Sequence, residues 1–296
     1  MMGSITISLD FELGWGAIED GLWRKREREN VYSRLRDVWP KLVTFLKDRD
    51  LPLVWATVGG MVSDRKESLD LSHLPVALQA KIVEFISSSE QHTHDGRDLI
   101  EALLHAGHSQ CIASHSLSHT RFDFAGLTRQ GRITELSESI RILSAYSSNV
   151  ESFVYPTNAI SDIDCLLLGG IKYVRTEPAY STTTGIAKLD WALNRIGKAP
   201  PISARREAAG GLISETGSLY YNWYGKHAEL MRKIVNFRAR RAIQSAAGQG
   251  GAYHFWAHPY NFIDTPGHFE DFMNMLDFAC KYRDSGALEF KIMSDH

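Results

Sequence analysis

The stretch Ala113-Ser114-His115-Ser116-Leu117-Ser118-His119-Thr120 guides the interpretation of this sequence. It begins at the end of a short apolar run, residues 110–113, of the kind expected for a buried strand. If the chain then turns into a helix, His115 and His119 lie one turn apart on the same face. Two imidazoles so placed can hold one metal ion, each at roughly 2.0–2.1 Å. A solvated or core-satisfied histidine pair has the same spacing, so the pair alone leaves both interpretations open.

Two further strand-like stretches end in residues suited to metal or acid–base chemistry. The first, Ile5-Thr6-Ile7-Ser8-Leu9-Asp10-Phe11-Glu12, puts Asp10 and Glu12 on the same side of a strand. One carboxylate can then bind a metal while the other acts as a base, although solvated acids at a strand end are the alternative. The second, Ala252-Tyr253-His254-Phe255-Trp256-Ala257-His258-Pro259, ends in His258. Active sites of parallel α/β proteins gather at the carboxyl ends of strands, so we expect these groups to lie together.

Together these motifs resemble those of the polysaccharide deacetylase family, which has the NodB-homology fold and is carbohydrate esterase family 4. The residues that carry the resemblance are, in order, Leu9-Asp10-Phe11-Glu12, Ser114-His115-Ser116-Leu117-Ser118-His119 and Phe255-Trp256-Ala257-His258. The longer stretch Ser8-Leu9-Asp10-Phe11-Glu12-Leu13-Gly14-Trp15-Gly16 is most similar to a branch found among surface-polysaccharide biosynthesis proteins.

The resemblance covers residues 5–293 and is weak over residues 176–250. It implies an α/β fold, a distorted (β/α) barrel of the NodB-homology type with parallel strands and surrounding helices. We expect residues 1–296 to form a single polysaccharide deacetylase-like catalytic domain, with a family-divergent insertion at residues 176–250. A length of 296 residues is normal for an α/β barrel.

Composition limits the classes of partner. Hydrophobic residues make up 44% and charged residues 23% of the chain, as in globular enzymes. The net charge of −2 gives no reason to expect nucleic acid or an anionic membrane as a partner. Three widely spaced cysteines, with no secretory signal in the N-terminal residues, favour free thiols and a cytoplasmic location. No apolar run approaches the roughly 20 residues of a transmembrane segment, and the sequence does not determine the oligomeric state.

The resemblance implies that Glu12, His115 and His119 hold a divalent metal ion. Such a site would leave coordination positions open for water and for the carbonyl oxygen of the substrate. Mixed nitrogen and oxygen ligands fit zinc, our first choice, and also cobalt, manganese or iron.

The resemblance also implies the acid–base roles. Asp10 would take the proton of the attacking water as general base, and His258 would protonate the leaving amine as general acid. The backbone N–H of Thr157 would help to bind the oxyanion of the tetrahedral intermediate. A carboxylate near His258, either Asp190 or Asp264, would raise the pKa of its imidazole.

Other residues are expected around the substrate. Trp15 lies in a glycine-containing loop and is either a stacking platform for a sugar or a lid on the core. Where this chain has Val154, the family often carries an arginine that steadies the catalytic aspartate. Arg175, at the end of the next strand, is the candidate replacement. The expected substrate-binding residues are Trp15, Tyr155, Pro156, Asn158, Arg175, Tyr260 and Asn261.

The reaction implied is the removal of an acyl group, acetyl first, from an N-acylated sugar or polysaccharide precursor. Such an enzyme is a hydrolase of carbon–nitrogen bonds other than peptide bonds. Two alternatives remain open. The same motifs serve hydrolysis of other C–N bonds, as in formamides and cyclic ureides, and the chain could be a non-catalytic sugar-binding member of the family. The missing arginine at Val154 and a doubtful match of Asp190-Trp191 to the family's fourth motif favour the latter.

Several local elements are also predicted. Asn30 is expected to cap a helix that Pro40 kinks or divides. Residues 92–95 are expected to form a loop, Ser161 and Asp164 a capping box, and residues 197–211 a loop.

Overall fold

The central sheet is built on β1 (Gly3–Phe11), the strand predicted from the N-terminal alternation. β1 pairs in parallel with β2 (Val54–Thr57) on one edge and with β9 (Ala252–Ala257) on the other. Next to β2, the first half of β1 pairs with β10 (Leu288–Lys291), also in parallel. The alternation of β1 sends Ile5, Ile7, Leu9 and Phe11 into the apolar core and leaves Ser8, Asp10 and Glu12 on the opposite face.

The computed structural model describes residues 2–105, 107, 110–177, 200, 202–207, 209–223 and 227–295. The remaining strands are β3 (Cys111–Ser114), β4 (Ser152–Val154), β5 (Tyr173–Thr176), β6 (Arg205–Glu207), β7 (Ile213–Thr216) and β8 (Leu219–Tyr220). The sheet order is β6-β7-β5-β4-β3-β2-β1-β9-β8, and every pair is parallel except β6–β7.

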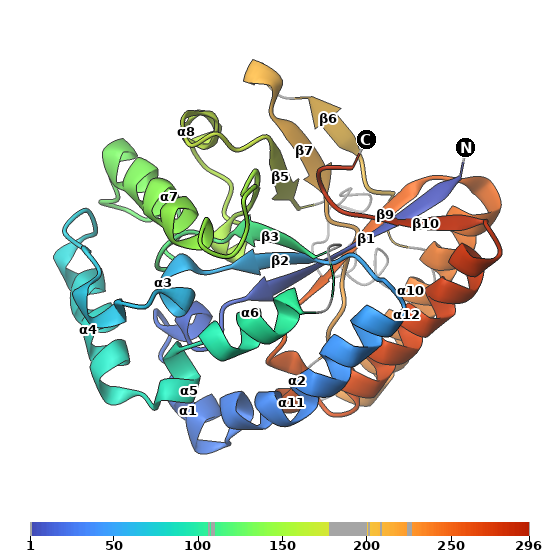
Figure 1. The fold of residues 1–296 in the computed structure, drawn as a ribbon, viewed down its shortest axis with the longest axis horizontal. Coiled ribbons are helices and arrows are strands. Elements are labelled where there is room, and N and C mark those ends of the chain that lie inside the picture. The colour runs from blue at the N-terminus through green and yellow to red at the C-terminus, as the bar shows by residue number, and fades with distance from the viewer. Residues whose placement is uncertain are drawn as a thin grey trace.

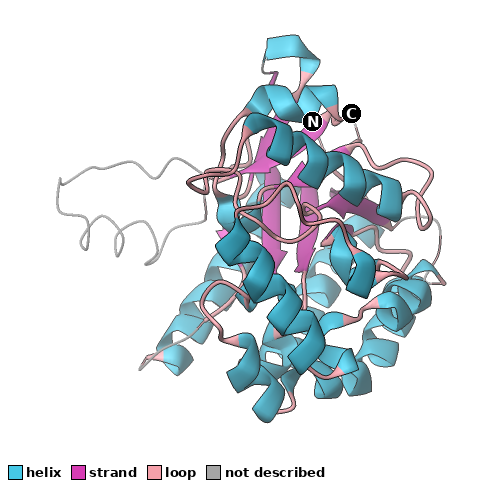
Figure 2. Ribbon diagram, turned by 90° about the vertical axis from the view of Figure 1, so that its left-hand side faces the viewer, coloured by secondary structure: helices cyan, strands magenta, loops and turns pink. Residues whose placement is uncertain are grey.

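Helices surround this curled sheet (Figures 1 and 2). They are α1 (Trp23–Arg28), α2 (Val31–Asp48), α3 (Gly59–Val62), α4 (Val76–Ser88), α5 (Gln91–His94), α6 (Arg97–Leu104), α7 (Arg129–Leu143), α8 (Ile163–Leu168), α10 (Ala228–Gln249), α11 (Asn261–Asp264) and α12 (His268–Asp284). Short 3-10 turns lie at η1 (Trp15–Ala17), η2 (Lys66–Ser68), η3 (Pro156–Asn158) and η4 (Ala209–Gly211). The arrangement is a distorted (β/α) barrel, which confirms the predicted fold class.

The helices bury their apolar faces against the sheet. In α2, Leu35, Leu42 and Leu46 recur at helical spacing and are fully buried. The Phe11 ring of β1 stacks on Trp39 of the same helix, with ring centroids 5.3 Å apart. This packing fixes β1, and with it the residues on its opposite face, against the helical layer.

Four local expectations were wrong. The chain after β3 forms a loop rather than a helix, so His115 and His119 converge by a different route. α2 runs through Pro40 without a break, because the packed face on both sides of the proline offsets one lost hydrogen bond. Residues 91–94 form the single turn α5. Strand β6 lies within the loop expected at residues 197–211, since it pairs with β7.

Two expected helix caps do not form. Asn30 precedes α2 in the left-handed region, with φ of 55°, and its side chain makes no cap hydrogen bond. α8 begins after Asp162, also left-handed at φ 48° and without a side-chain cap, so Ser161 and Asp164 form no capping box.

Part of the weakly matching stretch, residues 176–250, belongs to the sheet, because it contributes β6, β7 and β8. Among the described helices, none combines the length and the apolar character needed to cross a membrane. Cys111, Cys165 and Cys280 are all free thiols, as expected.

Candidate functional site

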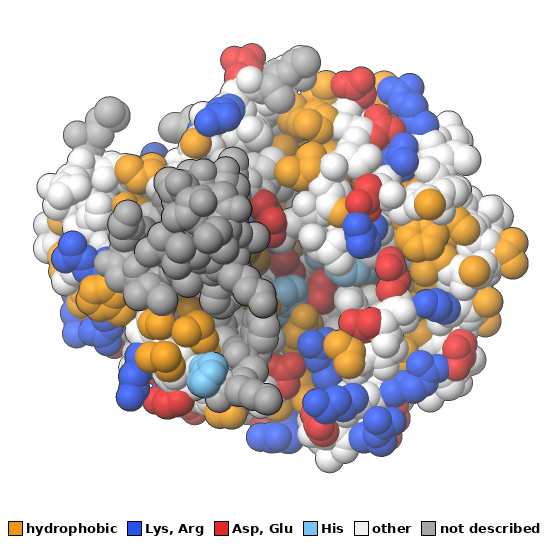
Figure 3. All heavy atoms as spheres, turned by 180° about the vertical axis from the view of Figure 1, so that it is seen from behind, with side chains coloured by type: hydrophobic (Ala, Val, Ile, Leu, Met, Phe, Trp, Pro, Cys, Tyr) orange, Lys and Arg blue, Asp and Glu red, His pale blue; other side chains and the backbone are white. Residues whose placement is uncertain are grey.

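The carboxyl ends of β1, β3 and β9 meet at a cavity of about 400 Å³. It is lined by Asp10, Glu12, Gly16, His115, His119, Thr157, Asn158, Glu177, Tyr220, Trp256, His258 and Tyr260. Figure 3 shows histidine and acidic side chains close together near the centre of one face of the molecule. The predicted gathering of the three motifs at one edge of the sheet is therefore confirmed.

Glu12, His115 and His119 form a compact, buried cluster. Glu12 Oε2 lies 2.8 Å from His119 Nε2 and 3.3 Å from His115 Nε2. One ligand atom from each residue falls within 4.8 Å of the others, a spacing that a single metal ion can bridge. A Cβ at Gly16 would come within 2.0 Å of Glu12 Oε1, so glycine is needed there to leave room for the carboxylate.

The hydrogen bonds of His115 suit a metal ligand. Its Nδ1–H donates to the Val154 carbonyl oxygen at 2.7 Å, which leaves the Nε2 lone pair directed at the cluster. Nε2 is buried, and Glu12 Oε2 at 3.3 Å has no proton to donate to it, so its lone pair lacks a donor among the described residues; this is costly unless a metal ion or another group binds there. The donor set and this unpaired nitrogen fit a divalent metal ion.

Electrostatics favour a negative charge on Glu12. Burial alone would raise the pKa of its carboxyl, but the charges of His119 and His258 lower that pKa well below its usual range. Burial would likewise lower the pKa of His119, and the Glu12 carboxylate raises it instead. A cation at this cluster would replace the proton that the histidine otherwise holds.

Asp10 is held by Arg175 of β5. The guanidinium donates to Asp10 Oδ1 at 2.6 Å and to Oδ2 at 2.7 Å, and both side chains are buried. Burial would raise the pKa of Asp10, but the charge and hydrogen bonds of Arg175 bring it below its usual value. The contact expected between Arg175 and the aspartate is thus present, and it occupies Arg175 with Asp10 rather than with the cavity.

A buried polar chain continues beneath this pair. Arg175 also donates to Ser8 Oγ at 2.8 Å, and Ser8 Oγ bonds His254 Nε2 at 2.7 Å. His254 Nδ1 lies 2.7 Å from Glu215 Oε1, and Arg205 donates to Glu215 Oε2 at 3.1 Å. Glu215 is on β7 and His254 on β9, so this contact joins strands far apart in the sheet order and closes the barrel interior.

His258 faces the cavity from the end of β9. Its Nε2 lies 3.6 Å from Glu12 Oε1 and 3.8 Å from Asp10 Oδ2. Its Nδ1 lies 3.0 Å from the hydroxyl of Tyr220. Burial lowers the pKa of His258, and the charges of Glu12 and Asp10 only partly oppose this.

Of the two carboxylates expected to raise the pKa of His258, the described one, Asp264, makes other contacts. Asp264 instead accepts hydrogen bonds from Arg26 and Asn261, at 3.2 and 3.3 Å. The other candidate, Asp190, lies outside the described residues, as does Trp191. Asp264 therefore does not raise the pKa of His258 as expected; burial lowers it, and among the described residues the neighbour on Nδ1 is the hydroxyl of Tyr220.

Thr157 and Asn158 line the same cavity as His258. Both have positive φ, 54° for each, within η3. For a β-branched residue such as Thr157 this is a strained conformation of the kind found at functional sites. The Asn158 side chain accepts from Arg175 at 3.1 Å and donates to Glu177 at 3.0 Å, so it links the Asp10 pair to Glu177.

Trp15 and Tyr155 do not face the cavity as substrate-binding residues would. Trp15 is 1% exposed, packs edge-on against Phe85 and donates its indole N–H to the His94 carbonyl. It is therefore the core lid of the two alternatives. Tyr155 is fully buried against Phe153 and donates its hydroxyl to the Ser161 carbonyl. Pro156 is also buried, and its role is to begin η3.

Other aromatic residues line the cavity instead. Tyr260 stacks on His258 with ring centroids 4.9 Å apart, and Trp256 stacks on Tyr220 at 5.7 Å. Asn261 lies behind them, and its Oδ1 accepts from the Tyr220 hydroxyl at 3.3 Å. Tyr220 was missed because β8 has two residues and no periodic pattern to mark it.

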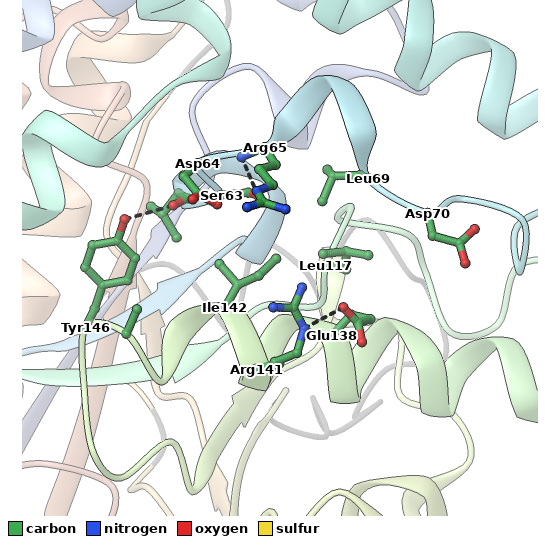
Figure 4. Close-up of a pocket in the computed structure, with 12 residues that line it drawn as sticks. Ser63, Asp64, Arg65, Leu69, Asp70, Leu117, Glu138, Arg141, Ile142 and Tyr146 are labelled. Atoms are coloured by element: carbon green, nitrogen blue, oxygen red, sulfur yellow. Dashed lines mark hydrogen bonds and ion pairs between the residues drawn. The ribbon is translucent and has the colours of Figure 1, made fainter.

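A larger cavity, of about 780 Å³, lies between α7 and the segment after α3 (Figure 4). Its polar side chains bind one another or the backbone: Arg141 pairs with Glu138 at 2.8 Å, and Tyr146 donates to the Val62 carbonyl. In the described part of the chain, the three side chains grouped so that they could hold a metal ion are Glu12, His115 and His119. None of them lines this larger cavity. The smaller cavity is therefore the candidate functional site.

Comparisons with known proteins add to this geometry. No known family profile matches the sequence, and no curated protein matches it either. A Mycobacterium smegmatis protein assigned as a polysaccharide deacetylase matches 99% of this chain and 88% of its own, with a TM-score of 0.61 and 14% identity. One from Pseudomonas aeruginosa matches 98% and 87%, with a TM-score of 0.55 and 12% identity.

The chain has the fold of the polysaccharide deacetylases. An allantoinase has it too, matching 98% of this chain and 87% of its own with a TM-score of 0.55 and 13% identity. At these identities the polysaccharide deacetylase fold is shared while the chemistry can differ. The reaction must therefore be argued from the site.

Proposed function

We propose that this chain is a metal-dependent hydrolase that removes an acyl group, acetyl first, from the nitrogen of an N-acylated sugar or polysaccharide precursor. The observation that carries the proposal is the presence, in one cavity, of the Glu12–His115–His119 cluster together with Asp10 and His258. The names of the deacetylase structures with the same fold support the substrate class.

Each residue has a defined task in this proposal. When bound at Glu12, His115 and His119, a divalent metal, zinc first, would supply a Lewis acid that polarises the amide carbonyl and acidifies water. Asp10, kept ionised by Arg175, takes the proton as water adds to the acyl carbon.

The second half of the reaction uses Thr157 and His258. The N–H of Thr157 donates to the oxyanion that forms on the former carbonyl oxygen. His258 gives its proton to the departing nitrogen as the C–N bond breaks, so that the products are an amine and a carboxylic acid.

The cavity walls suit a sugar. Trp256 and Tyr260 offer aromatic surface, and Asn158 and Glu177 offer polar groups for hydroxyls. The proposal includes a single catalytic domain, a role in surface-polysaccharide biosynthesis and a cytoplasmic location, the last supported by the three free thiols.

The allantoinase with the same fold favours a second candidate, hydrolysis of another C–N bond such as that of a cyclic ureide or formamide. One argument for a non-catalytic sugar-binding role was the missing arginine at Val154. Arg175 donates to Asp10 instead, so this argument no longer favours that role.

A two-stage experiment tests the proposal. The purified protein is stripped with a chelator, reloaded with zinc, and its bound metal is measured; about one equivalent is expected. Acetate release is then followed over N-acetyl sugars, nucleotide-linked sugars and lipid-linked sugars, beside formate release from formamides and ring opening of cyclic ureides to the ureido acid. Release from the sugars alone supports the proposal. Turnover of ureides alone supports the second candidate, and a metal-free, inert protein contradicts both.

A further inference from the structure

Side chains of α7 form hydrogen bonds at two points with the segment that carries His115 and His119. Ser114, directly before His115, shares a hydrogen bond between hydroxyls with Ser139 at 2.8 Å. Ser118, directly before His119, donates its backbone N–H to Glu135 Oε2 at 3.0 Å and its hydroxyl to Oε1 at 2.9 Å. Each histidine is therefore preceded by a serine that α7 holds.

The two anchors match the spacing of the histidines. Glu135 and Ser139 are one helical turn apart, so both lie on the same face of α7, and both are fully buried. Ser114 and Ser118 are likewise four residues apart, but the loop between them is not helical. The spacing of Glu135 and Ser139 on α7 thus supports the spacing of Ser118 and Ser114, which the loop backbone does not produce by itself.

The loop needs such support because its backbone is strained. Ser116 and His119 both have positive φ, 65° and 62°, which residues other than glycine rarely adopt. Strained conformations persist only where surrounding contacts determine them. From the other side, the N–H groups of Gly59 and Gly60 donate to the carbonyls of Ser116 and Leu117, at 2.9 and 2.7 Å. Leu117, between the two histidines, lies above α7 in Figure 4.

Burying the Glu135 carboxylate costs free energy, and a further hydrogen bond offsets part of that cost. His73, from the segment before α4, places Nε2 2.8 Å from Glu135 Oε1. The Glu135 side chain therefore receives three donors, two from Ser118 and one from His73. A carboxylate satisfied in this way holds its partners in one geometry, because each lost bond leaves a buried polar group unpaired.

We propose that Glu135 is a positioning residue for the metal centre. Its carboxylate fixes the turn at Ser118 and so directs the His119 imidazole toward Glu12, with Ser139 acting in the same way on Ser114 and His115. The inference rests on the proposed function, since it assumes that the cluster binds a metal. Groups that orient metal ligands from behind typically affect metal affinity or activity by roughly 10–100-fold.

The test is metal affinity rather than turnover alone. Zinc affinity is measured by competition with a chromophoric chelator, and ligand geometry by the visible spectrum of the cobalt-loaded protein. Glu135→Gln keeps the shape of the side chain but replaces one acceptor oxygen with a donor. We expect zinc binding weaker by roughly 10–100-fold and an altered cobalt spectrum. The matched control is Glu138→Gln on the exposed side of the same helix, which should bind zinc as the wild type does.

Ser118→Ala removes the hydroxyl, with its bonds to Glu135 and Thr120, and keeps the backbone bond to Glu135, so it remains informative if Glu135→Gln does not fold. We expect weaker zinc binding, with a smaller loss than in Glu135→Gln. Unchanged zinc affinity and an unchanged cobalt spectrum in the folded variants would overturn the inference, even if their melting temperatures fall. A wild type that binds no metal would instead overturn the proposed function, and this inference with it.

Discussion

Arg175 donates hydrogen bonds to both carboxylate oxygens of Asp10, although the two residues lie on strands that are not neighbours in the sheet. Asp10 is on β1 and Arg175 on β5, and the two meet across the barrel interior at 2.6 and 2.7 Å. The contact is bidentate and buried, the geometry in which a guanidinium is most effective. It keeps the proposed base ionised in a place where burial alone would favour the neutral acid.

Replacing this cation should therefore move the acid side of the activity profile. In Arg175→Met, we expect the pKa of Asp10 to rise, since the adjacent guanidinium is what holds it below its usual value against burial. The acid limb of kcat/KM should shift to higher pH, and Arg175→Lys should recover part of the change. Arg49→Met, which removes a partly exposed pair with Asp277, serves as the control. An acid limb that does not move would separate Arg175 from the chemistry.

His119→Ala should abolish metal retention and activity together, with little loss of folding. The imidazole lies 2.8 Å from Glu12 and supplies one of three ligand atoms. Metal content by elemental analysis and the unfolding midpoint are the measurements. Full metal occupancy in this variant would contradict the ligand assignment.

The two carboxylates of β1 should separate into a base and a ligand. Asp10→Asn should keep the metal and lose turnover, whereas Glu12→Gln should lose or weaken the metal, because Glu12 contacts both histidines. Metal content and kcat are measured on both variants in parallel. The reverse pattern would mean that the roles are exchanged.

His258 should control the alkaline side of the profile. A general acid must be protonated, so activity falls as pH rises through its pKa. Burial lowers the pKa of His258, so the limb should lie below the ordinary value of about 6.5 for a histidine. His258→Ala should lower kcat by roughly 10²–10⁴-fold, keep the metal and lose this limb. Paired pH–rate profiles are the measurement. An unchanged alkaline limb, with activity within a few-fold of wild type, would mean that His258 has only a structural role.

A second histidine should make stability depend on pH. His268 is fully buried, donates Nε2–H to the Tyr221 carbonyl at 2.6 Å, and burial lowers its pKa to about 4. The unfolded chain binds this proton near pH 6.5, so its contribution to stability is complete above that value and is lost as pH falls toward 4. The interval corresponds to about 3 kcal/mol.

Urea unfolding at several pH values tests this. In His268→Gln, the free energy of unfolding should fall less steeply between pH 6.5 and 4 than in the wild type. The exposed His105→Gln should leave the slope as it is. Identical slopes in wild type and His268→Gln would show that another group titrates.

The sequence predicted those parts of the site that depend on strand ends. Asp10, Glu12, His115 and His258 converge because parallel strands deliver their carboxyl ends to one edge, and the motifs marked those ends. The Arg175 contact could be expected for the same reason. Alternation along β1 also separated core residues from cavity residues correctly.

What the sequence could not provide depends on backbone conformation and on distant contacts. The positive φ of Ser116 and His119 leaves no periodic trace, so a helix was predicted where a loop lies. Trp15 looked available because a glycine-flanked tryptophan gives no sign of burial, and only the packing of Phe85 decides it. The hydrogen-bond partner of His258 Nδ1 is Tyr220, which lies in a stretch without a recognisable motif.

The placement of β1 at the centre of the sheet has a consequence for synthesis on the ribosome. β1 is made early and finds β2 soon afterwards, whereas its other neighbours, β9 and β10, are among the last strands to emerge. Until they do, β1 keeps one edge of unpaired N–H and carbonyl groups, the kind of edge that recruits strands from other chains. A nascent chain stalled before β9 thus exposes a strand edge that β9 covers in the folded protein.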